Sequence, residues 1–417
     1  MNQIFPYRLT HNGYIISGTM SGDLGVEIIS DSLLGKKVLF LVTGGIAAVD
    51  SVRVSRELRR HGADINCMMT SSAKNIISEL ALSWGSKAEV ISDWNHEMAQ
   101  LNNYDIILVA PATRNTIAKH INGIIDSPLI MALSAAKGNN TPILFVPSMH
   151  DDLFNDSVTQ SSIEKIQDKY SKVLIEESTE GRRKQPSAKT IVAELSNFLN
   201  SFRKNRKKIV VTLGATKQNI DSVRSIINYS SGKTGWDLCE YFHMMGHEVI
   251  CLAGNTTTSP NFPLKDVRIA EKPDEMLLIA LDIAISEKPD VWIHSAAVLD
   301  YVPQEIEGKK PSGEKKWSIE LVESKKHLSE LLPHTTDSIR IGFKLETDNS
   351  ETKLIEKSQN ILDKYSLTAV VANLISETKG RNGKRCRIIY PDGKIEYIEN
   401  NLMMAKAIER IFYHFTR

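Results

Sequence analysis

Residues suited to binding an anion gather in the segment 228–235, which reads Asn-Tyr-Ser-Ser-Gly-Lys-Thr-Gly. The segment follows a β-prone run with a glycine turn, residues 208–216, and precedes the amphipathic run 236–245. A helix that begins here would direct unpaired N–H groups and the positive end of its dipole at a bound anion. The glycines would let the backbone approach that anion closely. The same residues are also compatible with an ordinary serine N-cap that binds no ligand.

Small and hydroxyl-bearing residues also follow three apolar runs in the first half of the chain. They are Thr43-Gly44-Gly45, Thr70-Ser71-Ser72 and Pro111-Ala112-Thr113. Each run is typical of a buried parallel strand, and open α/β sheets hold their ligands at the carboxyl ends of the strands. These ends therefore suit a phosphate-bearing cofactor. The glycine pair by itself is equally compatible with a strand-to-helix turn that needs glycine for backbone reasons alone.

The elements that must position these residues alternate between strand and helix patterns, which is typical of parallel sheets covered by helices. In the first half we expect strands at 36–47 (with its glycine turn), 64–70, 105–113 and 142–150, and helices at 50–61, 115–122 and 129–136. In the second half we expect strands at 209–213, 248–253, 290–294, 338–343 and 368–372, helices at 237–245, 273–285, 327–332, 351–365 and 402–415, and β-ribbons around 316–322 and 386–398. The predicted fold class is α/β, with two doubly wound Rossmann-like domains.

A length of 417 residues favours two or three domains. We expect an N-terminal extension over 1–34 with hairpin-like pieces, a first α/β domain over 35–189, a linker helix within 190–207 and a second α/β domain over 208–417. The polar stretch 151–189 predicts a solvated loop, with a lid as the alternative.

Composition narrows the class of protein further. A charged fraction of 24% and a net charge of +1 lack the basic excess typical of nucleic-acid binding. The four cysteines are scattered and form no CxxC pair, so we expect neither a disulfide framework nor a metal site built from cysteines. Because no apolar run reaches spanning length and residues 1–10 lack a signal-peptide pattern, we expect a cytoplasmic protein without a membrane partner.

Five motifs of the second half occur in an order that resembles the bifunctional phosphopantothenoylcysteine decarboxylase/phosphopantothenate–cysteine ligase family of coenzyme A synthesis. They are Gly214-Ala-Thr216, the run 221–235, His294-Ser-Ala-Ala-Val-Leu-Asp-Tyr301, Gly342-Phe-Lys-Leu-Glu-Thr347 and Ala372-Asn373. The resemblance covers residues 36–417 and implies an N-terminal flavoprotein domain and a C-terminal ligase domain. Leu374 and Ala215 depart from the family, which usually has Asp and Pro there.

The resemblance implies amide formation in two steps. A carboxylate attacks the α-phosphate of CTP to give an acyl-cytidylate and pyrophosphate, and the amine of cysteine then displaces CMP. It implies that Asn228 stabilises the activated acyl group, that Arg224 meets the substrate phosphate, and that Lys309, or alternatively Lys310, closes over the triphosphate. The other implied substrate or nucleotide contacts are Gly214, Ser230, Ser231, Gly232, Lys233, Asp300, Phe343 and Lys364. Mg²⁺ is expected to accompany the nucleotide.

The first half resembles the flavin-binding decarboxylase domain of the same family, through residues 43–47 and 110–126. The resemblance implies FMN contacts from Thr43, Gly44, Gly45, Ile46, Thr70, Ser72, Pro111, Ala112, Thr113 and Asn115. His96 lies near the position of the family's catalytic histidine, and His150 replaces the asparagine that grips the substrate carboxylate. The family's lid carries a cysteine, whereas residues 151–189 contain none. Since serine cannot carry reducing equivalents, we do not expect complete reductive decarboxylation.

We therefore interpret the chain as a CTP-dependent phosphopantothenate–cysteine ligase fused to an FMN-binding, decarboxylase-like domain. Its expected partners are a 4′-phosphopantothenate-like acid, a cysteine-like amine, CTP and, as in the family, further copies of itself in a homo-oligomer. His150, Leu374 and the N-terminal extension leave one alternative open, a flavin-dependent decarboxylase and amide ligase of a specialised-metabolite pathway. The other alternative is a non-catalytic regulatory flavoprotein.

Overall fold

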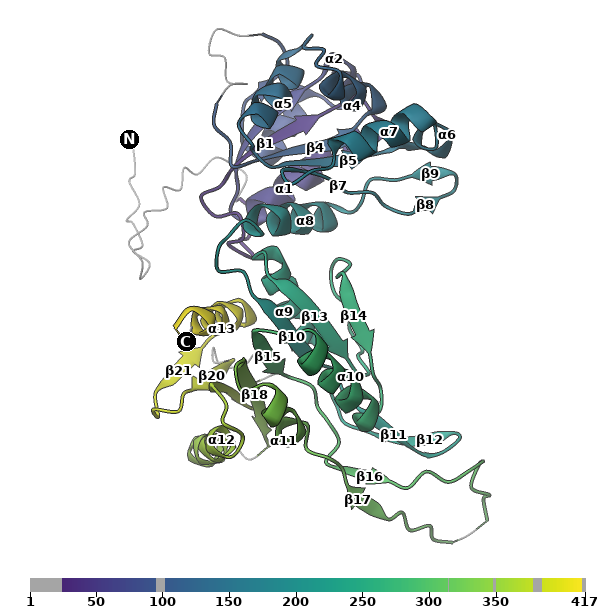
Figure 1. Cartoon of the computed structure of the whole chain (residues 1–417), viewed down its shortest axis with the longest axis vertical. Coiled ribbons are helices and arrows are strands. Elements are labelled where there is room, and N and C mark those ends of the chain that lie inside the picture. Colours follow the sequence, from purple (N-terminus) through teal and green to yellow (C-terminus); the bar gives the residue numbers. More distant parts are fainter. Residues whose placement is uncertain (1–24, 95–101, 314, 348–349, 378–384, 415–417) are drawn as a thin grey trace, which may run out of the picture.

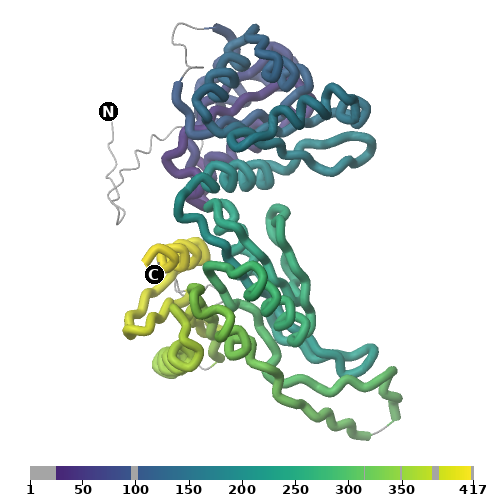
Figure 2. Tube along the Cα trace, in the orientation of Figure 1, coloured from purple at the N-terminus to yellow at the C-terminus, as the bar shows by residue number. Residues whose placement is uncertain are grey.

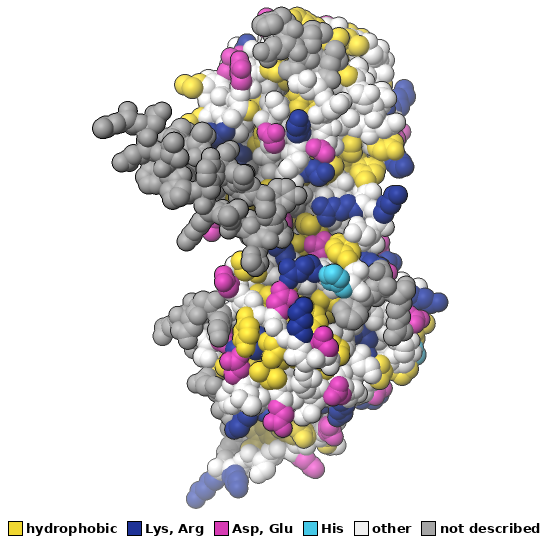
Figure 3. Space-filling model, turned by 90° about the vertical axis from the view of Figure 1, so that its left-hand side faces the viewer, with side chains coloured by type: hydrophobic (Ala, Val, Ile, Leu, Met, Phe, Trp, Pro, Cys, Tyr) yellow, Lys and Arg dark blue, Asp and Glu magenta, His cyan; other side chains and the backbone are white. Residues whose placement is uncertain are grey.

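The computed structural model describes residues 25–94, 102–313, 315–347, 350–377 and 385–414. Two α/β bodies lie one above the other along the long axis of the molecule, with the N-terminal body at the top of Figures 1 and 2. The predicted α/β class with two Rossmann-like parallel-sheet domains is confirmed. On the face shown in Figure 3, basic and acidic side chains are intermixed, in keeping with the net charge of +1.

The first body is built on a parallel sheet whose order is β3-β2-β1-β4-β5-β7 within the described residues. Its strands are β1 (Lys37–Val42), β2 (Asp64–Met69), β3 (Val90–Ile91), β4 (Ile106–Ala112), β5 (Ile143–Pro147) and β7 (Ser171–Val173). The chain winds outward from β1 in both directions, so the ends of β1 and β4 are neighbours at the point where the winding reverses. That point is where doubly wound sheets form a ligand crevice.

Helices cover both faces of this sheet because its central strands are apolar on both sides. One face packs against α1 (Ser51–Arg60), α3 (Glu79–Ser86) and α8 (Ala188–Asn200). The other packs against α4 (Arg114–Ile121), α5 (Pro128–Gly138) and α7 (Ser157–Ile166). Short elements complete the body: η1 (Ile46–Asp50), α2 (Ser71–Lys74), β6 (Met149–His150), α6 (Asp151–Phe154), β8 (Ser178–Thr179) and β9 (Arg182–Arg183).

The second body has a larger sheet in the order β14-β13-β10-β15-β18-β19-β20-β21 within the described residues. Its parallel strands are β10 (Lys208–Leu213), β13 (Glu248–Ala253), β14 (Asp266–Ile269), β15 (Val291–His294), β18 (Ile339–Glu346) and β19 (Ala369–Leu374). The antiparallel strands β20 (Cys386–Ile389) and β21 (Ile395–Ile398) extend the sheet beyond β19. The predicted ribbon at 386–398 is therefore part of the main sheet.

Amphipathic helices again cover the two faces of this sheet. The helices α9 (Lys233–Met244) and α13 (Asn401–His414) pack on one face. The opposite face is covered by α10 (Pro273–Ser286) with α11 (His327–Leu331), and by α12 (Glu351–Tyr365) beside β19; the 3-10 turn η3 (Leu332–His334) follows α11.

Two antiparallel hairpins project from the carboxyl edge of the second sheet, at the lower right of Figure 1. One pairs β11 (Lys217–Asp221) with β12 (Arg224–Ile227), which are not among the strands expected from the sequence. The other pairs β16 (Tyr301–Pro303) with β17 (Leu321–Glu323), so the ribbon predicted around 316–322 finds its partner upstream.

The prediction of a solvated loop over 151–189 is wrong. The segment forms α6, α7, the edge strand β7 and the β8–β9 hairpin, and Ile163 and Ile166 of α7 are buried. The helical periodicity was hard to recognise in this polar segment, because α7 buries only a narrow stripe of side chains along one face. The expected appendage at 1–34 also differs in its described part: residues 25–34 contain no strand, and Leu33 is buried in the first core.

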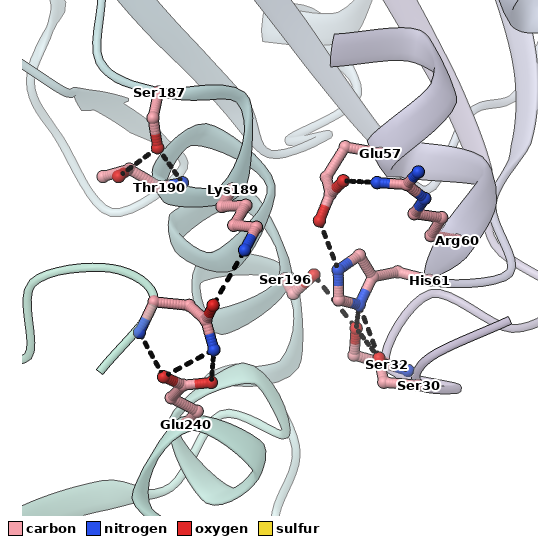
Figure 4. Close-up of polar contacts among 11 residues, drawn as sticks. Ser30, Ser32, Glu57, Arg60, His61, Ser187, Lys189, Thr190, Ser196 and Glu240 are labelled. Atoms are coloured by element: carbon pink, nitrogen blue, oxygen red, sulfur yellow. Dashed lines mark hydrogen bonds and ion pairs between the residues drawn. The ribbon is translucent and has the colours of Figure 1, made fainter. Parts of the chain in front are cut away.

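Polar side chains fix the described start of the chain at the junction of the two bodies (Figure 4). Ser30 Oγ lies 2.6 Å from His61 Nδ1, and His61 Nε2 lies 3.5 Å from a Glu57 carboxylate oxygen. Ser32 Oγ donates to Ser196 Oγ of α8 at 3.2 Å. Ser30, Glu57 and His61 are each at most 4% exposed, so this serine–histidine–glutamate arrangement serves to hold the segment in place.

Candidate functional site

The ends of three adjacent strands are tied together in the second body. After β10, Ala215 N–H donates to Asn255 O (2.9 Å), and Asn255 N–H donates back to Ala215 O (2.7 Å). Thr216 N–H donates to Ala297 O (3.1 Å), and Ala297 N–H donates to Gly214 O (2.8 Å). Gly214 has φ +77°, and a Cβ there would lie 2.7 Å from Asn255 O. Only glycine allows this close approach, which joins loops that are distant in sequence.

The helix α9 begins beside this junction, and its N-cap is Gly232, whose φ is +79°. A Cβ on Gly232 would lie 2.5 Å from Thr256 Cγ2, so the glycine lets the loop after β13 pack against the helix start. Thr258 Oγ1 donates to Ser231 O at 2.8 Å, which fixes the serine loop from the same side. An ordinary serine N-cap is therefore not what opens this helix, since its N-cap residue has no side chain.

The two serines bond within their own loop. Gly232 N–H donates to Ser230 Oγ at 3.4 Å, and Lys233 N–H donates to Ser231 Oγ at 3.3 Å. The Lys233 ammonium is 61% exposed and pairs with Asp237 one turn along α9, at 2.8 Å. The lysine predicted to hold a phosphate thus lies at the helix start, but in this structure it contacts its own helix.

Asn228 lies at the three-strand junction. Its side-chain N–H donates to Ala297 O at 3.2 Å, and the residue is half-buried. Ala297 is the residue that bonds Gly214, so Asn228 and the glycine turn lie on one ring of contacts. The structure therefore brings together Gly214, Asn228, the serine loop and the start of α9 at the carboxyl edge of the sheet.

Buried Asp221 connects this edge to the segment that carries the two lysines. Its carboxylate accepts hydrogen bonds from Val223 N (2.9 Å), Arg224 N (2.8 Å) and Lys310 N (3.2 Å), and pairs with the Arg224 guanidinium. Burial alone would raise the pKa of Asp221, but these N–H groups and the Arg224 charge outweigh it and lower the pKa. The Arg224 guanidinium also lies 5.1 Å from the centre of the Trp317 ring. Exposed Lys309 is adjacent to this anchored point.

The side chains of three further predicted contacts make no hydrogen bond to this group among the described residues, although Asp300 follows Leu299, whose N–H donates to Thr216 Oγ1 at 2.9 Å beside the junction. Asp300, 61% exposed, pairs with Lys326. Phe343 on β18 is half-buried against the core beneath the sheet. Lys364 lies in the last turn of α12, which runs back from the carboxyl edge, so it lies at the amino edge of the sheet beside the start of β19. Within one chain, Lys364 is not brought to the site.

His294 at the end of β15 belongs to a quoted motif, but the sequence assigned it no role. Its ring stacks on Trp292 with centroids 5.7 Å apart, and its Nε2 is buried without a hydrogen-bond partner among the described residues. Burial, together with the charge of Arg340 and the nearby His327, lowers the pKa of His294 to about 3. The imidazole is therefore neutral at physiological pH. Its buried position beside Trp292 could not be predicted from the sequence.

In the first body, the predicted cofactor residues meet at the ends of β1, β2 and β4. Buried Thr43 Oγ1 donates to Pro111 O (2.7 Å) and accepts from Thr113 N (3.0 Å), which joins β1 to β4. A Cβ on Gly44 would lie 2.3 Å from Ser72 Cβ, so this glycine lets β1 and β2 end side by side. Thr70 caps α2 by accepting from Ala73 N at 3.2 Å. Ala112 is buried at the end of β4.

A cavity of about 600 Å³ opens beside these ends. Four predicted cofactor contacts line it, Gly45, Ile46, Thr113 and Asn115, together with His150, Leu153 and residues 182–185 of the β8–β9 hairpin. This volume lies in the range of cofactor pockets. Ile46 is 76% exposed on its wall, which gives an apolar surface beside polar strand ends. The residues present therefore fit a flavin with a phosphate. His96 lies outside the described residues.

The class defined by this fold and these strand ends is a flavoprotein-type domain fused to a second Rossmann-like domain with a glycine- and serine-rich ligand edge. The family profile described as "Flavoprotein" matches residues 27–200, and the profile "DNA/pantothenate metabolism flavoprotein C-terminal domain" matches residues 204–411.

Curated relatives cover most of the chain. It is 34% identical over 355 residues to the coenzyme A biosynthesis bifunctional protein CoaBC of Methanocaldococcus jannaschii, covering 84% of this chain and 86% of that protein. The protein of the same name from Thermococcus kodakarensis is 31% identical over 354 residues, covering 83% and 87%. A solved C-terminal domain of a CoaBC protein is 26% identical, with a TM-score of 0.41, and covers 52% of this chain and 97% of its own.

The chain belongs to the family of coenzyme A biosynthesis bifunctional proteins. By family it is an enzyme, a fusion of a decarboxylase-type flavoprotein domain with a ligase-type domain. Among the residues described, none of the helices is long and apolar enough to span a bilayer. The same residues include no group of three or more His, Cys, Asp and Glu side chains arranged to hold a metal ion.

Proposed function

We propose that the second domain is a CTP-dependent phosphopantothenate–cysteine ligase. The observation that carries this proposal is the ring of contacts joining Gly214, Ala297 and Asn228 beside the start of α9. In the proposed reaction the substrate carboxylate attacks the α-phosphate of CTP, pyrophosphate leaves, and the cysteine amine then attacks the acyl carbon and expels CMP. Both steps develop negative charge on oxygen, which positioned N–H donors stabilise.

Several side chains at the carboxyl edge of the second sheet would contribute to these two steps. Asn228 already uses one N–H on Ala297 O, and its amide has a second N–H to offer the acyl oxygen. The serine loop and α9 start would receive the triphosphate, with Mg²⁺ brought by the nucleotide. Arg224 would meet the acid's phosphate, and Lys309, or Lys310 beside it, would close over the nucleotide. The Asp221 carboxylate accepts hydrogen bonds from Arg224 N and Lys310 N, and so keeps Arg224 and the lysine segment in fixed positions relative to each other.

For the first domain we propose FMN binding at the strand-end cavity without complete reductive decarboxylation. When bound, FMN supplies an oxidant for a thiol-bearing substrate. The chain's own residues supply an apolar wall at Ile46 and polar strand ends at Thr113 and Asn115. The β8–β9 hairpin covers this cavity with arginines and lysine, and residues 151–189 contain no cysteine to return reducing equivalents.

The test is a product assay on the purified full chain with CTP, Mg²⁺, 4′-phosphopantothenate and cysteine, following pyrophosphate release and product mass. We expect the mass of phosphopantothenoylcysteine without loss of CO₂. Asn228→Ala should lower kcat by at least about 100-fold, the usual effect of removing one oxyanion donor. Exposed Asn205→Ala is the matched control and should leave kcat unchanged.

The outcomes separate the alternatives. Untouched CTP would reject the ligase assignment and favour a regulatory flavoprotein. CTP turnover with another acid or amine would favour a specialised-metabolite ligase, and release of CO₂ would show that His150 and the cysteine-free hairpin still support decarboxylation. Cytoplasmic location and assembly into a homo-oligomer stay predictions.

A further inference from the structure

The β8–β9 hairpin is held against the edge of the flavin-side cavity by backbone pairing. Strand β9 pairs antiparallel with β6, with His150 opposite Arg182 and Met149 opposite Arg183. Asp151 N–H also donates to Gly181 O at 3.1 Å, and Ser178 Oγ donates to the Asp151 carboxylate. Residues directly opposite in an antiparallel pair project their side chains to the same face. His150 and Arg182 therefore form a lateral pair, and both line the cavity.

The neighbouring residue, Arg183, makes contacts that stabilise the hairpin. The Arg183 guanidinium lies 4.1 Å from the centre of the Phe154 ring and donates to Glu176 O at 3.3 Å. Its Nε lies 3.7 Å from the Asp151 carboxylate. Because Phe154 is buried, these contacts anchor the hairpin to α6. Arg183 thus fixes the position of β9, the strand that also carries Arg182.

The charges of the cavity wall do not balance. Of its cationic side chains, Arg114 pairs with Asp156, Arg183 with Asp151, and Lys184 with Glu180. The wall's carboxylate, Asp50, has its own partner in Arg53 at 3.4 Å. Across the described residues no carboxylate lies within ion-pair distance of Arg182, so its charge is open to a ligand. A guanidinium presents paired N–H donors that match a carboxylate or a phosphate.

We propose that Arg182, with His150 opposite, binds the anionic end of the small molecule that enters this cavity. The ligand class is a molecule with an apolar stem that ends in a carboxylate or a phosphate. The stem would lie on the exposed apolar side chains of Val49 and Leu153, which share the wall and are not among the predicted flavin contacts. The inference rests on the proposed flavin site, since it assigns the second occupant of the same cavity, and it makes Arg182 the residue that selects that occupant.

The test uses the full chain as purified with FMN, and its first measurement is flavin content by absorbance. Binding of hexanoate and of hexyl phosphate is then measured by isothermal titration calorimetry, with hexanol as the uncharged probe. We expect one or both anions to bind and hexanol to bind at least about tenfold more weakly. The tighter anion identifies the end group.

Arg182→Gln should weaken anion binding by about 10- to 100-fold, in line with the loss of a charge-assisted contact, while flavin content stays unchanged. Arg182→Lys should restore part of the affinity, because the charge returns without the paired donors. Exposed Arg206→Gln is the matched control and should bind as the unaltered chain does.

Three results would overturn the proposal: equal anion affinity of Arg182→Gln and the unaltered chain, tight binding of hexanol, or loss of FMN on substitution, which would assign Arg182 to the cofactor phosphate. A chain that contains no flavin but still binds anions through Arg182 would reject the proposed flavin site and leave the anion site standing. The two failures are therefore distinguishable.

Discussion

Glu194 of α8 and His243 of α9 form a buried contact of 2.9 Å that joins the two domains. The same carboxylate accepts from Lys172 of the first domain at 2.9 Å and lies 3.2 Å from Lys265 of the second. Asn197 and Asn200 add side-chain bonds to the carbonyl oxygens of His243 and Met244, at 2.7 and 2.8 Å. One buried carboxylate thus gathers cationic partners from both domains.

We expect Glu194→Gln to lower the free energy of unfolding by about 3 kcal/mol, because removing one member of a buried charge cluster leaves the others uncompensated. Chemical denaturation followed by tryptophan fluorescence measures this, and exposed Glu177→Gln is the matched control. Equal unfolding midpoints for the two variants would show that the cluster contributes nothing to stability.

The same carboxylate predicts a pH dependence. Burial alone would raise the pKa of Glu194, but the hydrogen bond from His243 and the charges of Lys172 and Lys265 outweigh it and lower the pKa below 4.5. A lowered pKa contributes stability that is fully present above the ordinary pKa and is lost as the pH falls from there toward the lowered pKa. From about pH 5 to about pH 3, the intact chain should lose more stability than Glu194→Gln does. Parallel curves would contradict this.

Gly232→Ala should reduce ligase activity at least about tenfold, because the added Cβ would lie 2.5 Å from Thr256 Cγ2 at a φ of +79°. Gly123→Ala is the matched control: Gly123 has φ +67°, but a Cβ there meets no atom within 4 Å. The control should lower stability by about 1 kcal/mol and leave ligase kinetics unchanged. Adding Thr256→Gly removes Cγ2 and also Cβ, which would lie 2.9 Å from the added atom, and should recover part of the activity; no recovery would place the effect in backbone strain alone.

Asp221→Asn should raise the KM for CTP several-fold, because the variant cannot pair with Arg224 and holds the Lys310 backbone less firmly. Steady-state kinetics with CTP varied would measure the change, and limited proteolysis should cut residues 306–320 faster. Exposed Asp363→Asn on α12 is the control. Unchanged proteolysis together with unchanged KM would reject a positioning role for Asp221.

The projecting hairpins carry exposed apolar side chains, with Val223 62%, Tyr301 57% and Leu321 45% exposed. Exposed apolar side chains on projecting hairpins are typical of an interface, and we expect a second copy of the chain to cover these hairpins. Leu321→Glu should then shift sedimentation velocity toward a smaller species. Ile285→Glu on α10, where the side chain is 57% exposed, should not. The same species for both variants would show that copies do not meet here.

The sequence by itself determined the repeating strand–helix pattern and the motifs at the strand ends. Runs such as β13 and α10 could be predicted almost to their bounds because their periodicity records which side chains are buried locally. Gly214 and Gly232 could also be singled out from the sequence, because each lies in a turn where the backbone adopts a positive φ that favours glycine.

The tertiary structure decided which of these motifs meet. Gly214, Asn255 and Ala297 come together because β13 and β15 flank β10, an order that no local pattern states. The direction of α12 places Lys364 at the opposite edge of the sheet, although the family resemblance implied a shared site. The pairing of Arg182 with His150 arises from a hairpin within a polar stretch that predicted only a loop. Strand order and hairpin docking depend on packing between distant segments, so the fold alone decided the composition of each site.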